Sequence, residues 1–308
     1  MGSKPKIILV TGFLGSGKTT LINRLIEYYR DKKIGLIIND FGQISVDGML
    51  VENIIHNAGK EESTNIFEIT NGSIFCSCLS AELVTALKEF VNINPEVLII
   101  ETSGLSDPST FNKILEENKL NEYYEVISSI CIVDPTKTPK LATKILAIER
   151  QIKSCNIIIV NKIDICEEHE YRSSYQLIEA INTKVKIIDT KYAEFDISKI
   201  EEKFEYEINP VTETCNTVSS RPGSIVLNPQ NATKEFLFNL YNEINSEIFR
   251  IKGFLKIDGQ NYYIYDNNDT LHIVIFEKEI EQYGLSVLLP VNKINTAKEI
   301  YVNFKNNN

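Results

Sequence analysis

The sequence predicts an α/β fold in which a parallel sheet carries helices on both faces, joined to a small α+β domain. Two observations lead to this prediction. Short β-branched apolar runs alternate with longer amphipathic stretches from about residue 6 to residue 188, which is the pattern of a parallel sheet covered by helices. The alternation stops near Pro210, and a length of 308 residues leaves room for a second domain at about 150 residues per domain.

The predicted strands of the first domain are almost entirely apolar, as expected for strands that are buried on both faces. They occupy residues 6–10, 34–38, 97–100, 126–133, 156–160 and 185–188. The amphipathic stretches between them predict helices at residues 19–29, 81–90, 110–119, 140–152 and 168–181. Residues 44–77 break the alternation, and we interpret them as an insertion.

The second domain follows a polar segment that contains Pro222 and Gly223 and shows little periodicity. Such a segment is typical of a linker. We therefore expect domains at residues 1–210 and 233–308, joined by a linker at residues 211–232. Within the second domain the pattern predicts a helix at 233–248, strands at 249–257, 262–265, 271–276 and 286–289, and a frayed tail at 305–308.

Composition excludes several classes of protein. Hydrophobic residues make up 43% and charged residues 24%, which is typical of a globular protein and not of a disordered chain. The 42 acidic residues outnumber the 32 basic ones, whereas nucleic-acid binding needs a basic face. No apolar run approaches the roughly 18 residues that cross a bilayer. Since the N-terminus also lacks the apolar segment of a signal peptide, we expect a cytoplasmic protein without membrane or nucleic-acid partners.

Cysteine and histidine usage narrows the possible metal chemistry. The three histidines exclude a histidine-rich metal site, and six scattered cysteines in a cytosolic chain do not indicate a disulfide framework. Four cysteines lie in or beside apolar strands or the linker, where we expect them to pack in the core: Cys131, Cys155, Cys166 and Cys215. Only the close pair Cys76 and Cys78 stands out.

A phosphate-binding loop directly follows the first predicted strand. Residues 12–19 read GFLGSGKT and match G-x-x-x-x-G-K-[ST] at the strand-to-helix junction that this motif requires. Its backbone N–H groups and the positive end of the following helix would surround phosphate oxygens, Lys18 would bridge the terminal phosphates, and Thr19 would offer a hydroxyl to Mg²⁺. The residues that we expect to bind the nucleotide are Gly12, Gly15, Ser16, Gly17, Lys18, Thr19 and Thr20.

A second polar segment, Glu101-Thr102-Ser103-Gly104, follows the predicted strand at residues 97–100. A carboxylate at this edge of a parallel sheet can hold a water on Mg²⁺, and the N–H of Gly104 can contact a γ-phosphate. We therefore predict catalytic roles for Glu101 and Gly104 beside Lys18, and assign Mg²⁺ to Thr19 and Glu101. A plain turn at the end of the strand is the alternative.

The sequence Asn161-Lys162-Ile163-Asp164 follows another apolar strand and matches N-K-x-D, a pattern of guanine recognition. Asp164 can accept hydrogen bonds from the N1–H and the N2 amine of guanine, which adenine does not supply. With adenine the carboxylate would lose these partners, at a cost of roughly 1–3 kcal/mol. We therefore predict that the nucleotide is GTP.

Between these segments lies Asn39-Asp40-Phe41-Gly42, with Asp47 further along. Asp40 is placed to orient the attacking water or a water on Mg²⁺, and we predict a catalytic role for it, with a turn-forming role as the alternative. Leu105 follows Gly104, where Ras-type GTPases carry a glutamine that aligns water. Because an alkyl side chain cannot align water, we expect slow intrinsic hydrolysis that a partner or dimerisation accelerates.

Together these segments resemble the CobW-type GTPases, relatives of the GTPases that insert nickel into hydrogenase and urease. GFLGSGKTTLINRL, NDFG, ITNG, ETSGLSDP and NKID occur in the family's order, and RIKGFL at residues 250–255 resembles the opening of its C-terminal domain. The resemblance implies a P-loop fold and a GTP-driven metallochaperone that transfers zinc or cobalt. The implied partner is a metalloenzyme or corrinoid-dependent client. Because we expect slow intrinsic hydrolysis that dimerisation accelerates, a second copy of the chain in a GTP-linked homodimer is a further candidate partner.

The chain departs from the family in its metal motif. The family usually carries C-x-C-C after Asn-Gly, but here the corresponding residues include Ser73 and Phe75, so that only Cys76 matches and Cys78 is an additional thiol. Two thiolates can hold zinc only when other ligands complete the set, for example His56, the client or a second copy. Cys76 and Cys78 are therefore candidates for the transferred metal, and packing in a turn is the alternative.

Two other functions compete with the metallochaperone. The first is a nucleotide-gated protein that binds no metal and remodels a client through its C-terminal domain. The second is a small-molecule kinase, which the N-K-x-D pattern and the absence of an arginine-rich lid segment disfavour.

Overall fold

The computed structural model describes residues 4–40, 48, 50–52, 55, 64–70, 73–75, 80–202, 223–229, 232–267, 270–280 and 282–307. These residues form two compact units. The first comprises the described residues of 1–39 and 47–218, and the second comprises Asp40 and the described residues of 219–308.

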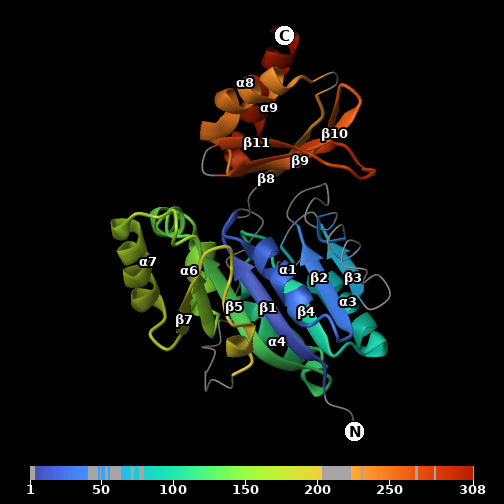
Figure 1. The fold of residues 1–308 in the computed structure, drawn as a ribbon, viewed down its shortest axis with the longest axis vertical. Coiled ribbons are helices and arrows are strands. Elements are labelled where there is room, and N and C mark those ends of the chain that lie inside the picture. The colour runs from blue at the N-terminus through green and yellow to red at the C-terminus, as the bar shows by residue number, and fades with distance from the viewer. Residues whose placement is uncertain are drawn as a thin grey trace. The chain divides into compact units, whose positions relative to one another are not determined.

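The first unit contains a parallel sheet of seven strands in the order β3-β2-β4-β1-β5-β6-β7 (Figure 1). The strands are β1 (Lys6–Gly12), β2 (Ile34–Asn39), β3 (Thr64–Ile69), β4 (Val97–Glu101), β5 (Glu125–Val133), β6 (Ile157–Val160) and β7 (Lys186–Asp189). The helices are α1 (Lys18–Tyr28), α3 (Ser80–Ile93), α4 (Phe111–Glu117), α5 (Thr138–Ala142), α6 (Leu146–Lys153) and α7 (Glu168–Ile181).

Helices cover both faces of this sheet because successive apolar residues of a strand point to opposite faces. Ile8 and Val10 of β1 pack in one buried cluster with Leu21 and Leu25 of α1. The alternate residues of the same strand pack in a second cluster with apolar residues of α3 and α4, among them Ile7, Leu9, Leu83, Leu87 and Phe111. The predicted α/β fold is therefore confirmed.

The second unit is built on an antiparallel sheet in the order β11-β10-β9-β12-β8. Its elements are β8 (Gly223–Leu227), α8 (Lys234–Ile244), β9 (Arg250–Ile257), β10 (Gln260–Asn267), β11 (Thr270–Ile275), β12 (Gly284–Leu289) and α9 (Ile294–Asn307). Thr233 is the N-cap of α8, since its Oγ1 accepts a hydrogen bond from the N–H of Phe236 at 3.0 Å.

The structure corrects four expectations about elements. Residues 64–69, which the sequence assigned to an insertion, form the edge strand β3. The single helix expected at 140–152 is two helices, because Ile145 adopts an extended conformation between α5 and α6. Residues 223–227 of the expected linker form β8, and residues 305–307 of the expected frayed tail belong to α9, while Asn308 lies outside the described residues. The domain boundaries themselves stay predictions.

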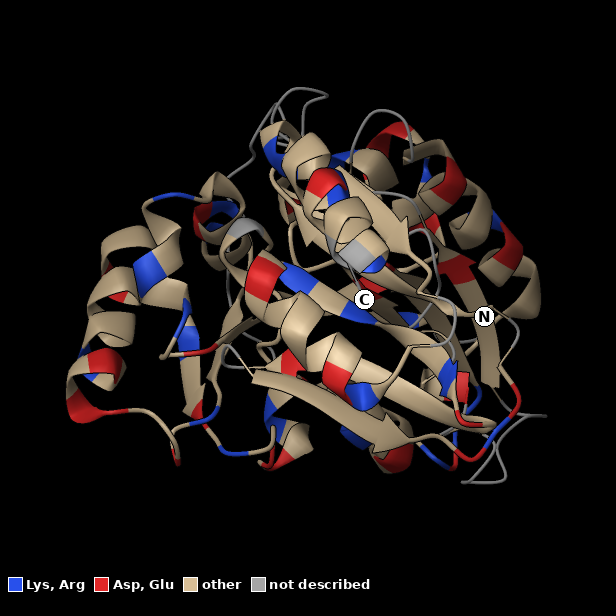
Figure 2. Ribbon diagram, turned by 90° about the horizontal axis from the view of Figure 1, so that it is seen from above, with Lys and Arg blue, Asp and Glu red and all other residues tan. Residues whose placement is uncertain are grey.

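Acidic and basic side chains are mixed along the chain, in which 42 acidic residues outnumber 32 basic ones. Lys and Arg are interspersed with Asp and Glu along the ribbon (Figure 2). Among the described residues, no helix has both the length and the apolar character that crossing a membrane requires.

Candidate functional site

The predicted phosphate loop connects β1 directly to α1. Gly12, Gly15 and Gly17 all have positive φ angles, of 139°, 73° and 114°. At Gly17 a Cβ atom would lie 2.4 Å from Nδ2 of Asn161, so only glycine fits both the backbone conformation and the space. This close approach brings the end of the phosphate loop against the predicted guanine-binding segment.

The start of α1 offers groups that can bind an anion. Gly17 is the N-cap and supplies no side-chain hydrogen bond to the first turn, which leaves backbone N–H groups directed out of the helix. Lys18 is 7% exposed, and its Nζ donates to the carbonyl oxygens of Gly12 at 2.9 Å and Phe13 at 3.2 Å. The loop is therefore closed around the ammonium group. Thr19 is half-buried and Thr20 is exposed.

Glu101 ends β4 beside the phosphate loop. It pairs in register with Val10 of β1 and is 2% exposed. The next residue fixes the turn that follows, because the N–H of Thr102 donates to the carbonyl of Val10 at 2.9 Å and its Oγ1 donates to Oγ1 of Thr11 at 3.0 Å. The carboxylate is thus held at the carboxyl edge of the sheet, where the phosphate loop begins.

The turn at residues 102–106, hereafter the 102–106 turn, lies against the phosphate loop. A Cβ atom on Gly104 would lie 2.7 Å from the backbone N of Leu14, which only glycine avoids. The structure therefore brings together Gly104 and the phosphate loop, as the sequence analysis expected of neighbouring strand ends. A displaced phosphate loop would press directly on this turn.

Two buried side-chain amides, to which the sequence alone assigned no role, hold the 102–106 turn. Gln151 of α6 is 1% exposed, and its Nε2 donates to the carbonyls of Gly104 at 3.2 Å and Ser106 at 2.9 Å. Asn39 accepts from the N–H of Ser103 at 3.2 Å. One signal in the sequence could have revealed Gln151: it occupies a core-facing position of its helix, beside Ile148 and Ile152.

The predicted guanine segment is anchored by Asn161. This residue is 2% exposed; its Nδ2 donates to the carbonyl of Ser16 at 2.9 Å, and its Oδ1 accepts from the N–H of Ala193 at 3.0 Å. Asn161 therefore joins the phosphate loop to the loop at residues 190–194. Lys162 forms an ion pair with Asp134 at 2.7 Å, and Asp164 is exposed.

The 190–194 loop is a part of the site that the sequence did not indicate. Tyr192 and Ala193 have positive φ angles of 54° and 51°, although neither is a residue type that favours this conformation. Arg24 of α1 fixes the loop by donating from Nε to the carbonyl of Tyr192 at 2.7 Å. The Tyr192 side chain is 66% exposed beside this anchored backbone.

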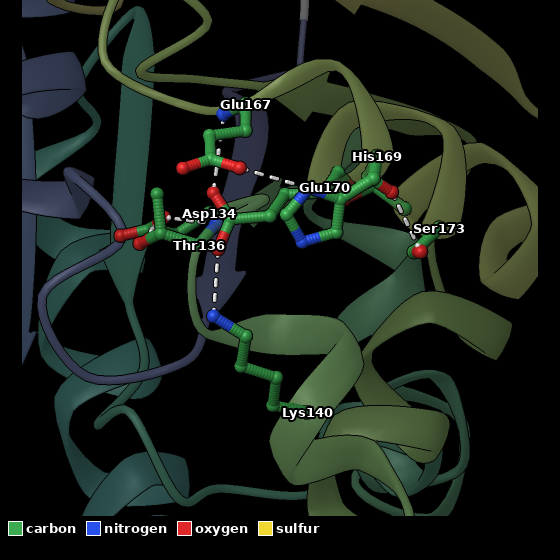
Figure 3. A network of polar contacts seen from close by, with 8 residues as sticks. Asp134, Thr136, Lys140, Glu167, His169, Glu170 and Ser173 are labelled. Atoms are coloured by element: carbon green, nitrogen blue, oxygen red, sulfur yellow. Dashed lines mark hydrogen bonds and ion pairs between the residues drawn. The ribbon is translucent and has the colours of Figure 1, made fainter.

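A polar network fixes the start of α7, shortly after the guanine segment (Figure 3). Lys140 of α5 donates to Oε1 of Glu170 at 2.6 Å, and the other oxygen of Glu170 accepts from the N–H of Glu167 in a capping box. The hydrogen bond from Lys140 holds the pKa of Glu170 below its usual value. Asp134 belongs to the same region and accepts from both the N–H and the Oγ1 of Thr136.

Asp40 is grouped with the second unit. It is 4% exposed, and its Oδ2 accepts from Nζ of Lys252, a residue of β9, at 2.8 Å. Both charges are buried and paired, which is the arrangement that makes such burial tolerable. The water-orienting role expected for Asp40 stays a prediction.

The candidate ligands of a transferred metal lie outside the described residues: Cys76, Cys78 and His56. Asp47, which follows the Asn39-Asp40-Phe41-Gly42 segment, also lies outside them. Within the described part of the chain, no group of three or more His, Cys, Asp or Glu residues could hold a metal ion. Ser73 and Phe75, which stand where the family usually has cysteine, are both buried. Phe75 packs edge-on against Phe111, with ring centroids 6.0 Å apart.

Of the other cysteines, Cys131 and Cys155 are buried, as predicted, and burial raises the pKa of the Cys155 thiol. Cys166 is half-buried, and Cys215 lies outside the described residues.

Comparison with known proteins gives consistent matches. Residues 6–189 match the sequence family described as CobW/HypB/UreG, nucleotide-binding domain. The chain is 27% identical over 278 residues to the zinc chaperone YjiA of Escherichia coli (strain K12), which covers 82% of each chain. It is 44% identical over 103 residues to the zinc chaperone CobW of Sinorhizobium sp, which covers 32% of this chain and 28% of that one. A solved structure of Zn(II)-bound YjiA GTPase from E. coli aligns over 98% of this chain and 99% of that chain, with 18% identity and a TM-score of 0.47.

Proposed function

Because the chain belongs to the CobW/HypB/UreG family of nucleotide-binding domains, we propose that it is a GTPase that couples GTP binding and hydrolysis to delivery of a metal ion to a client protein. One observation carries most of this proposal. The Asn161 side chain bonds to Ser16 of the phosphate loop and to Ala193 of the 190–194 loop. A single residue thus fixes the predicted phosphate site and the predicted base site in one arrangement.

The nucleotide is GTP in this proposal. The phosphates bind the N–H groups of the phosphate loop and of the first turn of α1, and Lys18 turns from the loop carbonyls to the phosphate oxygens. The base binds Asp164, which is exposed and follows directly on the anchored Asn161. Phosphate contacts supply affinity, and the carboxylate supplies the preference for guanine.

The residues present also fit Mg²⁺, which prefers oxygen ligands. Thr19, in the first turn of α1, offers a hydroxyl, and Glu101, the last residue of β4, offers a carboxylate. The strand β1, which leads into the phosphate loop, pairs in register with β4. When bound, Mg²⁺ would neutralise charge that develops on the phosphate oxygens. Glu101 is buried at the strand end, so its position does not depend on loop movement.

Hydrolysis by the chain alone is slow in this proposal. Leu105 follows Gly104 and is 2% exposed, so its alkyl side chain packs in the core. Neither its chemistry nor its position suits it to align an attacking water. Stimulation then comes from a client or from a second copy in a GTP-linked homodimer, and the cytosol is the expected compartment.

The cargo is zinc in the first instance, with cobalt as the second candidate. Two of the relatives described above are named zinc chaperones, YjiA and CobW. Cys76 and Cys78 are the proposed thiol ligands, and a client metalloenzyme, including a corrinoid-dependent one, completes the set. Because two thiolates are fewer than the three or four ligands of stable zinc sites, the metal would be held loosely enough to transfer.

A second candidate function is a nucleotide-gated protein that remodels its client without binding metal. The observation that favours it is Phe75, which stands at an expected thiol position and instead packs against Phe111 in the core. A phenylalanine side chain offers no metal ligand, so this position contributes to packing and not to metal binding.

Measuring Zn²⁺ and Co²⁺ affinity with GDP and with a non-hydrolysable GTP analogue tests the proposal. The metallochaperone predicts that affinity differs between the two nucleotides and is lost in the double variant C76S/C78S, while the control C166S, which changes a half-buried thiol, retains it. Client activation that persists in C76S/C78S would favour the second function. Absence of GTP binding would remove both.

A further inference from the structure

Asn39 lies at the end of β2, between two strands that lead to different parts of the proposed machinery. It pairs in register with Ile69, the last residue of β3, while the preceding residue Ile38 pairs with Glu101, the last residue of β4. The strand order β3-β2-β4 therefore places the Asn39 side chain where both neighbouring chains leave the sheet. At 1% exposure, the side chain is closed off from solvent.

The side-chain amide of Asn39 both donates and accepts hydrogen bonds. Its Nδ2 donates to the carbonyl of Ile69 at 3.0 Å, and its Oδ1 accepts from the N–H of Ile74 at 3.2 Å. The same Oδ1 accepts from the N–H of Ser103 at 3.2 Å and from Oγ of Ser106 at 3.3 Å. One buried oxygen thus links the segment at residues 73–75, hereafter the 73–75 segment, to the 102–106 turn.

Three donors share an oxygen that has two lone pairs. The two bonds from N–H groups exceed the usual optimum of about 2.9 Å, and the bond from the Ser106 hydroxyl exceeds the optimum of about 2.8 Å for O–H donors, as expected when donors compete. If one donor leaves, the oxygen can bond the others more closely. The state of the 102–106 turn therefore affects the bond that Asn39 makes to Ile74.

We propose that Asn39 is the positioning residue that transmits the nucleotide state from the 102–106 turn to the 73–75 segment. This inference rests on the proposed function, in which Gly104 contacts the γ-phosphate. Movement of the turn toward that phosphate withdraws Ser103 and Ser106 from the Asn39 oxygen, and the bond to Ile74 tightens. Since Ile74 precedes Cys76 by two residues, the signal reaches the backbone next to the proposed thiol ligands.

Hydrogen exchange at the Ile74 amide, measured by NMR on the full chain, tests this inference. We expect exchange to be slower with Mg²⁺ and a non-hydrolysable GTP analogue than with GDP, by roughly two- to tenfold, the range that corresponds to one hydrogen bond. In N39A this difference should disappear. In S106A, which removes one competing donor, Ile74 should already be protected with GDP, and the difference should shrink.

The matched control is N182A. Asn182 is also buried, and its Nδ2 donates to the carbonyls of Ile152 and Cys155. We expect N182A to keep the nucleotide-dependent difference at Ile74. Loss of the difference in N182A, or its persistence in N39A, would overturn the inference. If N39A does not fold, S106A provides the test. A nucleotide-dependent difference in Ile74 exchange that is as large in S106A as in the wild type would then overturn the inference.

Calorimetry on the same samples separates this inference from the proposed function. Wild-type chain that binds both nucleotides but shows equal Ile74 exchange in each would overturn the role of Asn39 and leave the GTPase intact. Wild-type chain that binds no GTP would instead overturn the proposed function, and the inference with it.

Discussion

At the scale of residues, nucleotide specificity depends on Asp164. Its carboxylate can accept from both the N1–H and the N2 amine of guanine, whereas an asparagine at this position has one acceptor oxygen and would present its NH₂ group to the other guanine donor. We expect D164N to lower GTP affinity roughly tenfold or more, because an unpaired polar group costs about 1–3 kcal/mol. Xanthosine triphosphate carries an oxygen in place of the N2 amine, and D164N should bind it more tightly than the wild type does.

Competition binding with the two nucleotides checks this expectation. The gain for xanthosine triphosphate is the informative result, since damage to the fold cannot produce it. A variant that keeps wild-type affinity for GTP would show that Asp164 does not contact the base.

Some residues of the candidate site can be predicted from the sequence, and others cannot. Short sequence motifs identify two segments of the site, Gly12 to Thr19 and Asn161 to Asp164. Such motifs are reliable when the predicted strand and helix lie at the positions that the motif requires. Asn39 acts through bonds to segments that are distant in sequence. Ala193 contributes a backbone N–H at a positive φ angle, and neither feature depends on its side chain. Tertiary contacts of this kind leave no local pattern.

At the scale of elements, α6 is coupled to the 102–106 turn through Gln151. Replacing Gln151 with Leu keeps the bulk and removes the donor to the carbonyls of Gly104 and Ser106. We expect Q151L to lower the free energy of unfolding by roughly 1–3 kcal/mol, the cost of buried acceptors that lose their donor. Denaturant unfolding measures this change.

The control for Q151L is Q176L, which changes an exposed glutamine of α7. Substitutions at exposed helix positions usually shift stability by at most about 0.5 kcal/mol. If Q151L were as stable as Q176L, the two hydrogen bonds would not hold the turn.

The start of α7 should be sensitive to acid through Glu170. The hydrogen bond from Lys140 lowers the pKa of Glu170 from 4.5, so the ionised form is favoured in the folded state. The resulting stabilisation is fully present above pH 4.5 and is lost as the pH falls through the lower folded value. We expect wild type to be more stable than E170Q near neutral pH and the gap to close in acid.

Thermal unfolding of wild type and E170Q as a function of pH measures this gap. E179Q, which removes an exposed carboxylate from the same helix, controls for the change of net charge. A gap that stays constant into the acid range would mean that the bond to Lys140 does not stabilise the helix.

Elements with a strong apolar signal were predictable, and those without it were not. Five strands of the first sheet, β1, β2, β4, β5 and β6, are mostly buried runs that alternate with amphipathic helices, and β7 is only partly buried. The edge strand β3 has mostly half-buried residues, so it lacks that signal. The break at Ile145 contains neither Gly nor Pro, and apolar residues continue across it at helical spacing. The strand β8 was missed because its partner, β12, lies far away in the sequence.

At the scale of the whole molecule, the chain combines a parallel nucleotide-binding sheet with a separate antiparallel unit. The first unit has one buried apolar cluster on each face of its sheet, where helices cover the strands. All residues of these two clusters belong to the first unit. The second unit has a core of its own, formed by its sheet with α8 and α9. The net charge of −10 favours a protein client over nucleic acid as the partner.

Every function proposed for this chain requires that it binds GTP in the phosphate loop that follows β1. Isothermal calorimetry of the full chain with Mg²⁺, titrated separately with GTP and ATP, tests it most directly. We predict saturable heat with GTP and at least about tenfold weaker binding of ATP, since adenine leaves the Asp164 carboxylate unpartnered. Saturation by ATP without any response to GTP, or no response to either nucleotide, would contradict the account.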